Sequence, residues 1–170
     1  MFEFNPWRIG LGLMLAAGLV GCSGKPEDTG QSASGAASTT SPAPPYPAWA
    51  TAMLGKDVKQ VSPGAVTCKG VIDVVSAKHT GAHPGSEIEG WAWNETQHRP
   101  LAKIVFTDQA DRIVGGATVG NPRQDVMAAM SEVKTPAVGW RGVARPISGA
   151  VTAVGLTDGA ASCVLGSITL

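Results

Sequence analysis

Charged residues are scarce in this chain of 170 residues, and neither sign of charge dominates. Lys and Arg number 13, Asp and Glu also number 13, and the formal net charge is therefore zero. A nucleic-acid-binding domain requires a basic patch, and no cluster of Lys and Arg occurs in the sequence, so we expect no nucleic-acid partner. The hydrophobic fraction of 44% is sufficient for a core, and we expect one compact domain.

A hydrophobic run long enough to span a bilayer is also missing. The main apolar run, residues 9–20, would be about 18 Å long as a helix, whereas the hydrocarbon core of a bilayer is about 30 Å thick. This length is typical of the central region of a signal peptide. No second run of spanning length follows it.

The apolar run ends in Leu19-Val20-Gly21-Cys22, which resembles the lipobox of bacterial lipoproteins. The resemblance implies that residues 1–21 are a signal peptide and that the Cys22 thiol carries a diacylglyceryl group. With a further acyl chain such as palmitate, this lipid would make the membrane a permanent partner. Ser23, rather than Asp, follows the cysteine, which in Gram-negative lipoproteins implies the outer membrane, with the domain facing the periplasm. An uncleaved short anchor and a plain secretory signal are the alternatives.

Cysteine is rare, with three residues in the chain. If Cys22 is lipidated, Cys68 and Cys163 remain as an even pair in an oxidising compartment, and we expect a disulfide between them. Such a bridge would stabilise the fold by about 4–5 kcal/mol. Two free thiols or a metal site are the alternatives, but the histidines show no ligand spacing around either cysteine. We therefore expect no metal and no other cofactor.

Residues 22–47 are rich in Ser, Ala, Gly, Thr and Pro. Such a segment cannot bury enough apolar surface to offset its ordering entropy, and we expect it to be a flexible tether. Residues 48–65 are expected to form a short helix and a lead-in to the domain, because Pro47 suits a first helical turn and Gly55 suits a helix end.

Residues 66–170 are predicted to form an all-β domain. Val and Ile recur in short stretches, and Asp158-Gly159 is typical of a two-residue hairpin turn. One short helix is expected after Asn121. The predicted strands lie at 71–75, 87–93, 103–107, 112–118, 138–144, 150–156 and 162–170. The pattern predicts a mainly β fold, a small antiparallel β-sandwich or partly open barrel of six to seven strands with one short helix.

Four short motifs stand out in this domain: Gly70-Val71-Ile72-Asp73, Gly90-Trp91-Ala92-Trp93, Arg123-Gln124-Asp125-Val126 and Gly139-Trp140-Arg141-Gly142. Together they resemble a small, uncharacterised all-β domain that is associated with the bacterial envelope. The resemblance covers roughly residues 66–170. It implies the fold and the compartment but no activity.

Three tryptophans in these motifs, Trp91, Trp93 and Trp140, form the basis of a candidate binding surface. Their rings could stack on a sugar or a peptide, and each indole N–H supplies one donor. Arg141, next to Trp140, and Arg123 complete the candidate surface, because Arg and Trp are enriched among the residues that dominate interface energies. The alternative is that the tryptophans fill the core, where the neighbouring glycines make room for them.

The sequence offers little for catalysis. Glu87 and Glu89 project to the same face of a predicted strand, about 7 Å apart, as a carboxylate pair does in some hydrolases, but alternating acids are more typical of a solvent-exposed face. His79 and His83 lie in a Gly/Pro-rich loop, and the chain has neither a Ser nucleophile elbow nor a Gly-rich phosphate loop. We assign no catalytic residue and do not expect an enzyme.

The expected function is that of a lipid-anchored envelope lipoprotein, a non-catalytic binding or accessory module for another envelope component. The first alternative is a glycan- or peptidoglycan-binding module that uses an exposed tryptophan. The second is an inhibitor of a cell-wall hydrolase. Exposed tryptophans clustered in a groove would favour a glycan, whereas a flat apolar patch would favour a protein partner.

Overall fold

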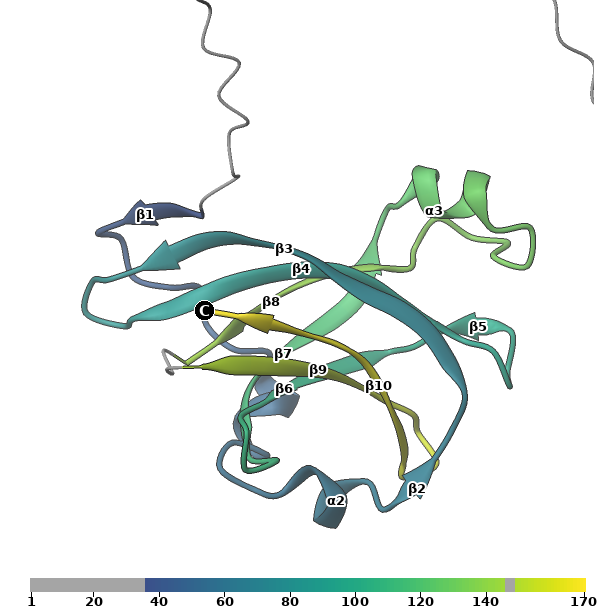
Figure 1. Ribbon diagram of the computed structural model, residues 1–170, viewed down its shortest axis with the longest axis horizontal. Helices are drawn as coiled ribbons and strands as arrows, with labels where there is room; N and C mark the ends of the chain where they lie inside the picture. Colours follow the sequence, from purple (N-terminus) through teal and green to yellow (C-terminus); the bar gives the residue numbers. More distant parts are fainter. Residues whose placement is uncertain (1–35, 146–148) are drawn as a thin grey trace, which may run out of the picture. The chain divides into compact units, whose positions relative to one another are not determined.

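A computed structural model describes residues 36–145 and 149–170 of the chain. The expected signal peptide, the lipobox and Cys22 lie outside these described residues. Over the described residues the fold is mainly β, with ten strands in one open sheet and three short helices (Figure 1).

The strands differ widely in length, from two residues to twelve. In chain order they are β1 (Ala37–Thr39), β2 (Gly64–Ala65), β3 (Cys68–His79), β4 (Gly85–Asn94), β5 (Arg99–Pro100), β6 (Lys103–Thr107), β7 (Ile113–Asn121), β8 (Gly139–Ala144), β9 (Ala150–Leu156) and β10 (Ala161–Thr169). The helices are α1 (Ala48–Thr51), α2 (Val58–Val61) and α3 (Gln124–Ala129).

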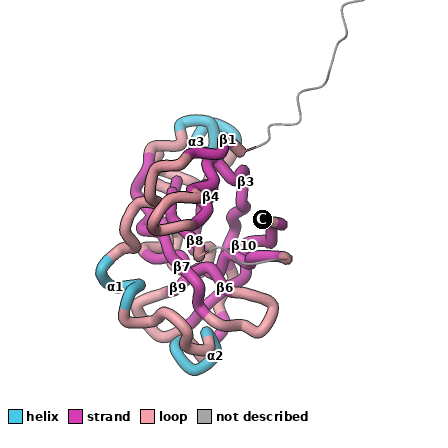
Figure 2. Tube along the Cα trace, turned by 90° about the vertical axis from the view of Figure 1, so that its left-hand side faces the viewer, coloured by secondary structure: helices cyan, strands magenta, loops and turns pink. Residues whose placement is uncertain are grey.

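Seven strands form an antiparallel series in the order β3-β4-β8-β7-β6-β9-β10. The short strands β1 and β2 extend its two ends by parallel pairing with β3 and β10, and β5 pairs with β4. The sheet curls, so that β3 and β10, the first and last strands of the series, are joined by a disulfide between Cys68 and Cys163. Figure 2 shows both strands on the same side of the molecule. The predicted disulfide is thus confirmed, with the two Cα atoms 6.2 Å apart.

The predicted number of six to seven strands is wrong, because the sheet has ten. The seven strands of the antiparallel series correspond to the seven predicted stretches, and the three that were missed, β1, β2 and β5, have only two or three residues each. Strands this short carry no alternating pattern. The described residues also form three short helices, whereas two were predicted, one within residues 48–65 and one after Asn121. One of them, α2, has four residues and begins after Asp57, whose carboxylate accepts a hydrogen bond from the Lys59 backbone N–H at 2.8 Å.

Residues 36–47, which the sequence assigns to the tether, lie against the domain. β1 pairs with the end of β3, from Ala37 opposite Ala77 to Thr39 opposite His79. The segment passes close to Gly81, where a Cβ atom would lie 2.3 Å from the Thr40 carbonyl oxygen. Only glycine allows this approach. The structure therefore shortens the expected tether at its C-terminal end.

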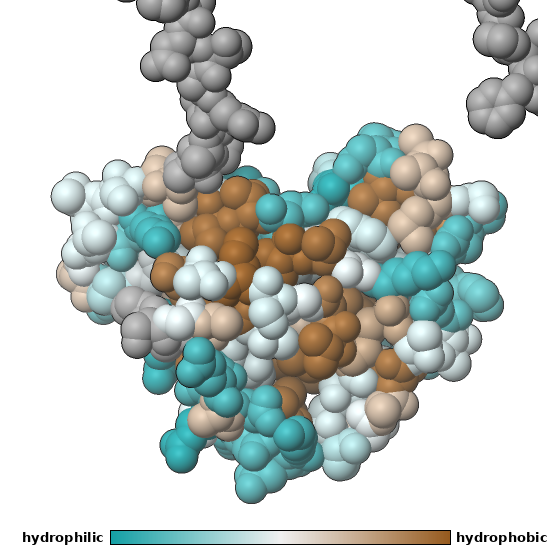
Figure 3. All heavy atoms as spheres, viewed as in Figure 1, coloured by the Kyte–Doolittle hydropathy of each residue, from teal (hydrophilic) through white to brown (hydrophobic). Residues whose placement is uncertain are grey.

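The inner face of the sheet carries the main hydrophobic core. Hydrophobic residues also gather near the centre of the view in Figure 3, where Figure 1 draws β3, β4 and β10. Period-two alternation along β4 places Ile88, Gly90 and Ala92 on the inner face, and neighbouring strands contribute in the same register. The buried residues of the cluster are Ile88, Ala92, Leu101, Ile104, Phe106, Val114, Ala117, Trp140, Ala144, Val151, Ala153 and Leu165.

Two smaller clusters cover parts of the outer face. Near α1 and α2, Trp49, Met53, Leu54 and Val61 pack on a buried group made of Val58, Val105, Ile113, Val154 and Leu156. Near α3, Trp93 is buried with Val126, Val133 and Val138. Trp91 of β4 packs against this second cluster and is half-buried, whereas Arg141 of β8, on the same face, is exposed.

Candidate functional site

The structure buries two of the three tryptophans that were expected on the binding surface. Trp140 is 1% exposed and packs on the inner face against Phe106, with ring centroids 5.7 Å apart. Trp93 is 2% exposed and lies in the cluster next to α3. Neither ring can stack on a ligand in this fold. The expectation that Trp93 and Trp140 form a binding surface is therefore wrong, because both rings fill core.

The register of β4 and β8 explains which tryptophan is buried. The two strands are antiparallel and place Gly90 opposite Trp140 and Trp91 opposite Gly139. On the inner face, a Cβ atom at Gly90 would lie 2.3 Å from Trp140 Cζ2, so Trp140 fills the space that this glycine leaves. On the outer face, a Cβ atom at Gly139 would lie 2.8 Å from Arg123 Cγ. Each glycine thus makes room for a large side chain on its own face of the sheet.

The other three predicted residues, Trp91, Arg123 and Arg141, do come together on the outer face. Trp91 is half-buried in β4 and pairs across strands with Val71 of β3, which is exposed. Glu89 follows on the same face of β4, directly opposite Arg141 of β8. We refer to these five residues, Val71, Glu89, Trp91, Arg123 and Arg141, as the Trp91 surface.

Arg123 crosses the Trp91 surface from β8 to β3. Its Cγ lies over Gly139 of β8, whereas its guanidinium donates a hydrogen bond to Asp73 of β3. Because β4 lies between these two strands, the side chain passes over β4 near Trp91. The same guanidinium donates two hydrogen bonds to the carboxylate of Asp125, at 2.8 and 2.7 Å. Two carboxylates therefore fix Arg123 in position.

These contacts shift the pKa values of both partners. The hydrogen bonds to Asp125, and then the contact with Asp73, raise the pKa of Arg123 above its ordinary value. In return, the hydrogen bonds from Arg123 lower the pKa of Asp125 to about 2. The guanidinium and its carboxylate partner are thus both charged at neutral pH. Asp73 was not assigned to the site from the sequence, although it is the one polar residue in the apolar stretch 71–75.

Arg141 belongs to a polar row that crosses four strands of the outer face. The register places Glu89, Arg141, Thr118 and Lys103 side by side in β4, β8, β7 and β6. Arg141 forms an ion pair with Glu89 at 2.8 Å, yet 57% of its side chain is exposed. Trp49 lies against the Thr118 and Lys103 side of the row: its Nε1–H donates to Thr118 Oγ1 at 3.1 Å, and Lys103 Nζ lies over its ring. Arg141 is therefore both positioned by its neighbour and accessible to a partner.

The side chains considered for catalysis are engaged in other contacts. Glu89 pairs with Arg141, whereas Glu87 Oε1 lies 2.7 Å from His79 Nε2. His79 is buried, and its Nδ1 lies 3.2 Å from the Ser41 carbonyl oxygen, so the imidazole fastens the segment after β1 to the sheet. The two glutamates therefore do not share an open site, as a pair of catalytic carboxylates would.

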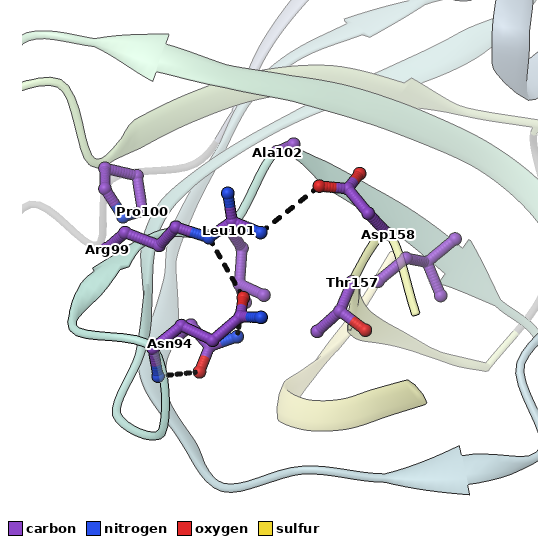
Figure 4. Close-up of a pocket in the computed structure, with 9 residues that line it drawn as sticks. Asn94, Arg99, Pro100, Leu101, Ala102, Thr157 and Asp158 are labelled. Atoms are coloured by element: carbon purple, nitrogen blue, oxygen red, sulfur yellow. Dashed lines mark hydrogen bonds and ion pairs between the residues drawn. The ribbon is translucent and has the colours of Figure 1, made fainter. Parts of the chain in front are cut away.

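A small hollow lies between the turn after β4 and the turn after β9 (Figure 4). Its volume is about 40 Å³, which suits water molecules rather than a substrate. The polar side chains around it bond to one another. Arg99 donates to Gln97 at 2.9 Å and to Asp158 at 3.2 Å, and Asn94 donates to Gln97 at 3.1 Å. These bonds fasten the two turns, and we assign the hollow a structural role.

A wider surface groove, of about 540 Å³, is lined by both disulfide cysteines and by residues of β2, β9, β10 and α2. Val164, which is 68% exposed, lies in it. The charged residues that line it, Lys59 and Asp111, form an exposed ion pair with each other. The groove therefore offers apolar contact but no arrangement suited to catalysis.

None of the helices in residues 36–145 and 149–170 is long and apolar enough to cross a membrane. The same described part of the chain holds no group of three His, Cys, Asp or Glu side chains that is placed to bind a metal ion. No protein-family model, no curated protein and no solved structure matches the chain.

Proposed function

We propose that this chain is a lipid-anchored lipoprotein of the bacterial envelope whose domain binds another envelope protein through the Trp91 surface. The lipobox at Leu19–Cys22 supports the anchor, and Ser23 supports an outer-membrane location with the domain in the periplasm. The disulfide is consistent with an oxidising compartment of this kind. In this proposal the curled sheet is a partly open barrel that serves as a rigid support, and the disulfide joins β3 to β10, the first and last strands of its antiparallel series.

The observation that supports the proposal most strongly is the combination of apolar contact area with fixed charges. Trp91 and the exposed Val71 supply the apolar area, and Arg141 supplies an accessible charge. Arg123 is already held by two carboxylates, so little side-chain entropy would be lost when a partner binds. Trp and Arg are also the residue types that most often dominate interface energies.

A glycan is the second candidate ligand, and Trp91 is the observation that favours it. Its half-buried indole could stack on a sugar ring. Of the three tryptophans considered, however, only this one remains partly accessible, and a single ring provides little stacking area. We therefore rank a protein partner above a glycan. An inhibitor of a cell-wall hydrolase is a special case of the protein-binding proposal.

Affinity capture from the native envelope tests the choice between these ligands. The full-length chain is captured after mild cross-linking, alongside the variants Trp91→Ala and Val164→Ala. We expect one dominant protein to accompany the wild type and Val164→Ala but not Trp91→Ala. Recovery of peptidoglycan without a stoichiometric protein, lost in the same variant, would replace the protein partner by a glycan.

The anchor is tested separately by metabolic labelling with a palmitate analogue. We expect the label on the wild-type chain and its loss in Cys22→Ser, which should also move to the soluble fraction of the envelope. Labelling that persists in Cys22→Ser would contradict the lipobox interpretation and leave the binding surface unaffected.

A further inference from the structure

The segment Pro42-Ala43-Pro44-Pro45-Tyr46-Pro47 lies on the domain surface, and its sequence favours the backbone of a polyproline II helix. Each of its four prolines has φ fixed near −65°, and a residue that precedes proline is restricted to extended or polyproline II backbone. Together these two restrictions apply to every residue of the segment. Pro47 shows the resulting backbone, with φ −53° and ψ 136°. No regular helix or strand is found between β1 and α1 in this part of the chain.

Contacts with the domain hold the start of this segment, and a helix follows directly at its end. Upstream, the Ser41 carbonyl oxygen lies 3.2 Å from His79 Nδ1. At the second residue of the segment, the Ala43 backbone N–H donates to the His83 carbonyl oxygen at 2.9 Å. A Cβ atom at Gly85 would lie 3.2 Å from Ala43 Cβ, so this alanine packs directly on β4. Downstream, α1 begins at Ala48.

Burial along the segment follows the three-residue period of a polyproline II helix. Ala43 and Tyr46, three residues apart, are half-buried and form the edge that faces the domain. Pro42 and Pro45, also three residues apart, are exposed and form a second edge. On the third edge Pro44 is exposed, whereas Pro47, directly before α1, is half-buried. The segment therefore turns one edge inward and presents one edge of two exposed prolines, Pro42 and Pro45, outward.

We propose that this segment, which we call the proline strip, is a docking site for a protein domain with an aromatic-lined groove that recognises polyproline II helices. Such grooves receive prolines three residues apart, in the pattern PxxP, and the exposed pair Pro42 and Pro45 has this spacing. Pro44 and Pro47 repeat the spacing, but Pro47 is half-buried. Because contacts with the domain hold Ser41 and Ala43, and proline rings restrict the backbone between them and α1, binding would order little further backbone. The proline strip is a separate element from the Trp91 surface, and the proposal does not depend on that surface.

A proline-rich segment that serves only as a rigid spacer would have the same composition but would need no contact with the domain. Ala43, in contrast, is hydrogen-bonded to His83 in the loop between β3 and β4, and it packs on Gly85 of β4. A surface hollow of about 460 Å³ also flanks the strip, lined by Tyr46, His83, Pro84 and Val143 among others. This leaves space beside the prolines for the ring edges of an aromatic groove.

The test is a titration of the full-length chain into two isotope-labelled probe domains, one SH3 domain and one WW domain, followed by nuclear magnetic resonance. We expect resonances of the aromatic groove to move in at least one probe. The double variant Pro42→Ala/Pro45→Ala should raise the dissociation constant by about tenfold, because it removes both prolines of one outward edge. Pro63→Ala removes an exposed proline outside the strip and should leave binding unchanged.

Absence of any shift in the groove of both probes would overturn the proposal. So would a double variant that binds as tightly as the wild type, or a Pro63→Ala variant that weakens binding to the same extent. Circular dichroism of each variant checks the fold. If the double variant does not fold, Pro45→Ala alone provides the test, with an expected increase of about threefold in the dissociation constant.

Discussion

The two Gly-Trp motifs of this domain are nearly the same in sequence and opposite in structure. In β4, Gly90 faces inward and Trp91 outward, whereas in β8, Gly139 faces outward and Trp140 inward. In the pairing of the two strands, the glycine of each motif lies directly opposite the tryptophan of the other motif. The same two residues therefore build core in one strand and accessible surface in the next, and strand register decides between them.

The largest expected effect on stability comes from removing the disulfide, and it should not change which of the two tryptophans is buried. Replacing Cys68 and Cys163 by alanine removes the link between the first and last strands of the antiparallel series. The free energy of unfolding should fall by about 4–5 kcal/mol, because the bridge closes a long loop in the unfolded chain. Urea denaturation measures it. A loss below about 1 kcal/mol would show that the sheet holds its curvature without the bridge.

Replacing each tryptophan by alanine in turn should lower the free energy of unfolding by different amounts in the two motifs. Trp140→Ala leaves a cavity in the inner core and should destabilise the fold by about 3–5 kcal/mol. Trp91→Ala affects a half-buried ring and should cost about 1 kcal/mol. Both values come from urea denaturation at one pH. Equal losses would contradict the assignment of one tryptophan to the core and the other to the surface.

A double-mutant cycle tests the pairing itself. Gly90→Ala introduces a Cβ atom 2.3 Å from Trp140 Cζ2, and it should be less destabilising once Trp140→Ala has removed the ring. We expect a coupling energy of at least about 1 kcal/mol between the two positions. Rescue should be partial, since the same Cβ atom would lie 2.1 Å from the Val71 carbonyl oxygen. Additive effects would mean that Gly90 does not make room for Trp140.

The smallest expected effect is a pH dependence next to Trp93. Hydrogen bonds from Arg123 lower the pKa of Asp125 from an ordinary 3.8 to about 2, and a hydrogen bond from Lys69 lowers that of Glu132. A pKa that is lower in the folded state stabilises the fold above the ordinary value, and this stabilisation is lost as the pH falls from about 4 to about 2. The Lys69–Glu132 contact ties the α3 segment to β3, and Asp125 holds Arg123, which forms a second link to Asp73 of β3. Trp93 lies in the cluster beside this segment.

We therefore expect the Trp93 indole N–H resonance to shift between about pH 4 and pH 2, while the Trp140 resonance stays in place. Asp125→Asn should remove part of the shift. Simultaneous movement of both resonances would indicate global unfolding in place of a local change at α3.

Much of the fold could be predicted because short-range patterns specify it. The Val/Ile stretches and turn residues indicated all seven strands of the antiparallel series, and an even pair of cysteines indicated the disulfide. The short strands could not be predicted, because β1 and β5 depend on pairing with β3 and β4 rather than on their own residues. The helix α2 had a local signal in Asp57, a typical N-cap residue.

The candidate site could be predicted only in part, because it depends on register between distant segments. Period two along one strand placed Trp91 and Trp93 on the same face, yet the cluster beside α3 buries Trp93 fully and Trp91 only in part. The partnership of Arg123 with Asp73 joins residues 50 positions apart, which no local pattern indicates. The contact of His79 with Glu87 likewise required the β3–β4 pairing.

The most direct test of the Trp91 surface uses two exposed valines, Val71 on that surface and Val164 in the groove beside the disulfide. Each is replaced in turn by a photo-cross-linking amino acid in the full-length chain, which is then irradiated in its native envelope. We predict a discrete protein adduct from position 71 that disappears when Trp91→Ala is added, and none from position 164. An adduct from position 164 alone, or one from position 71 that persists with Trp91→Ala, would contradict the assignment of the binding surface.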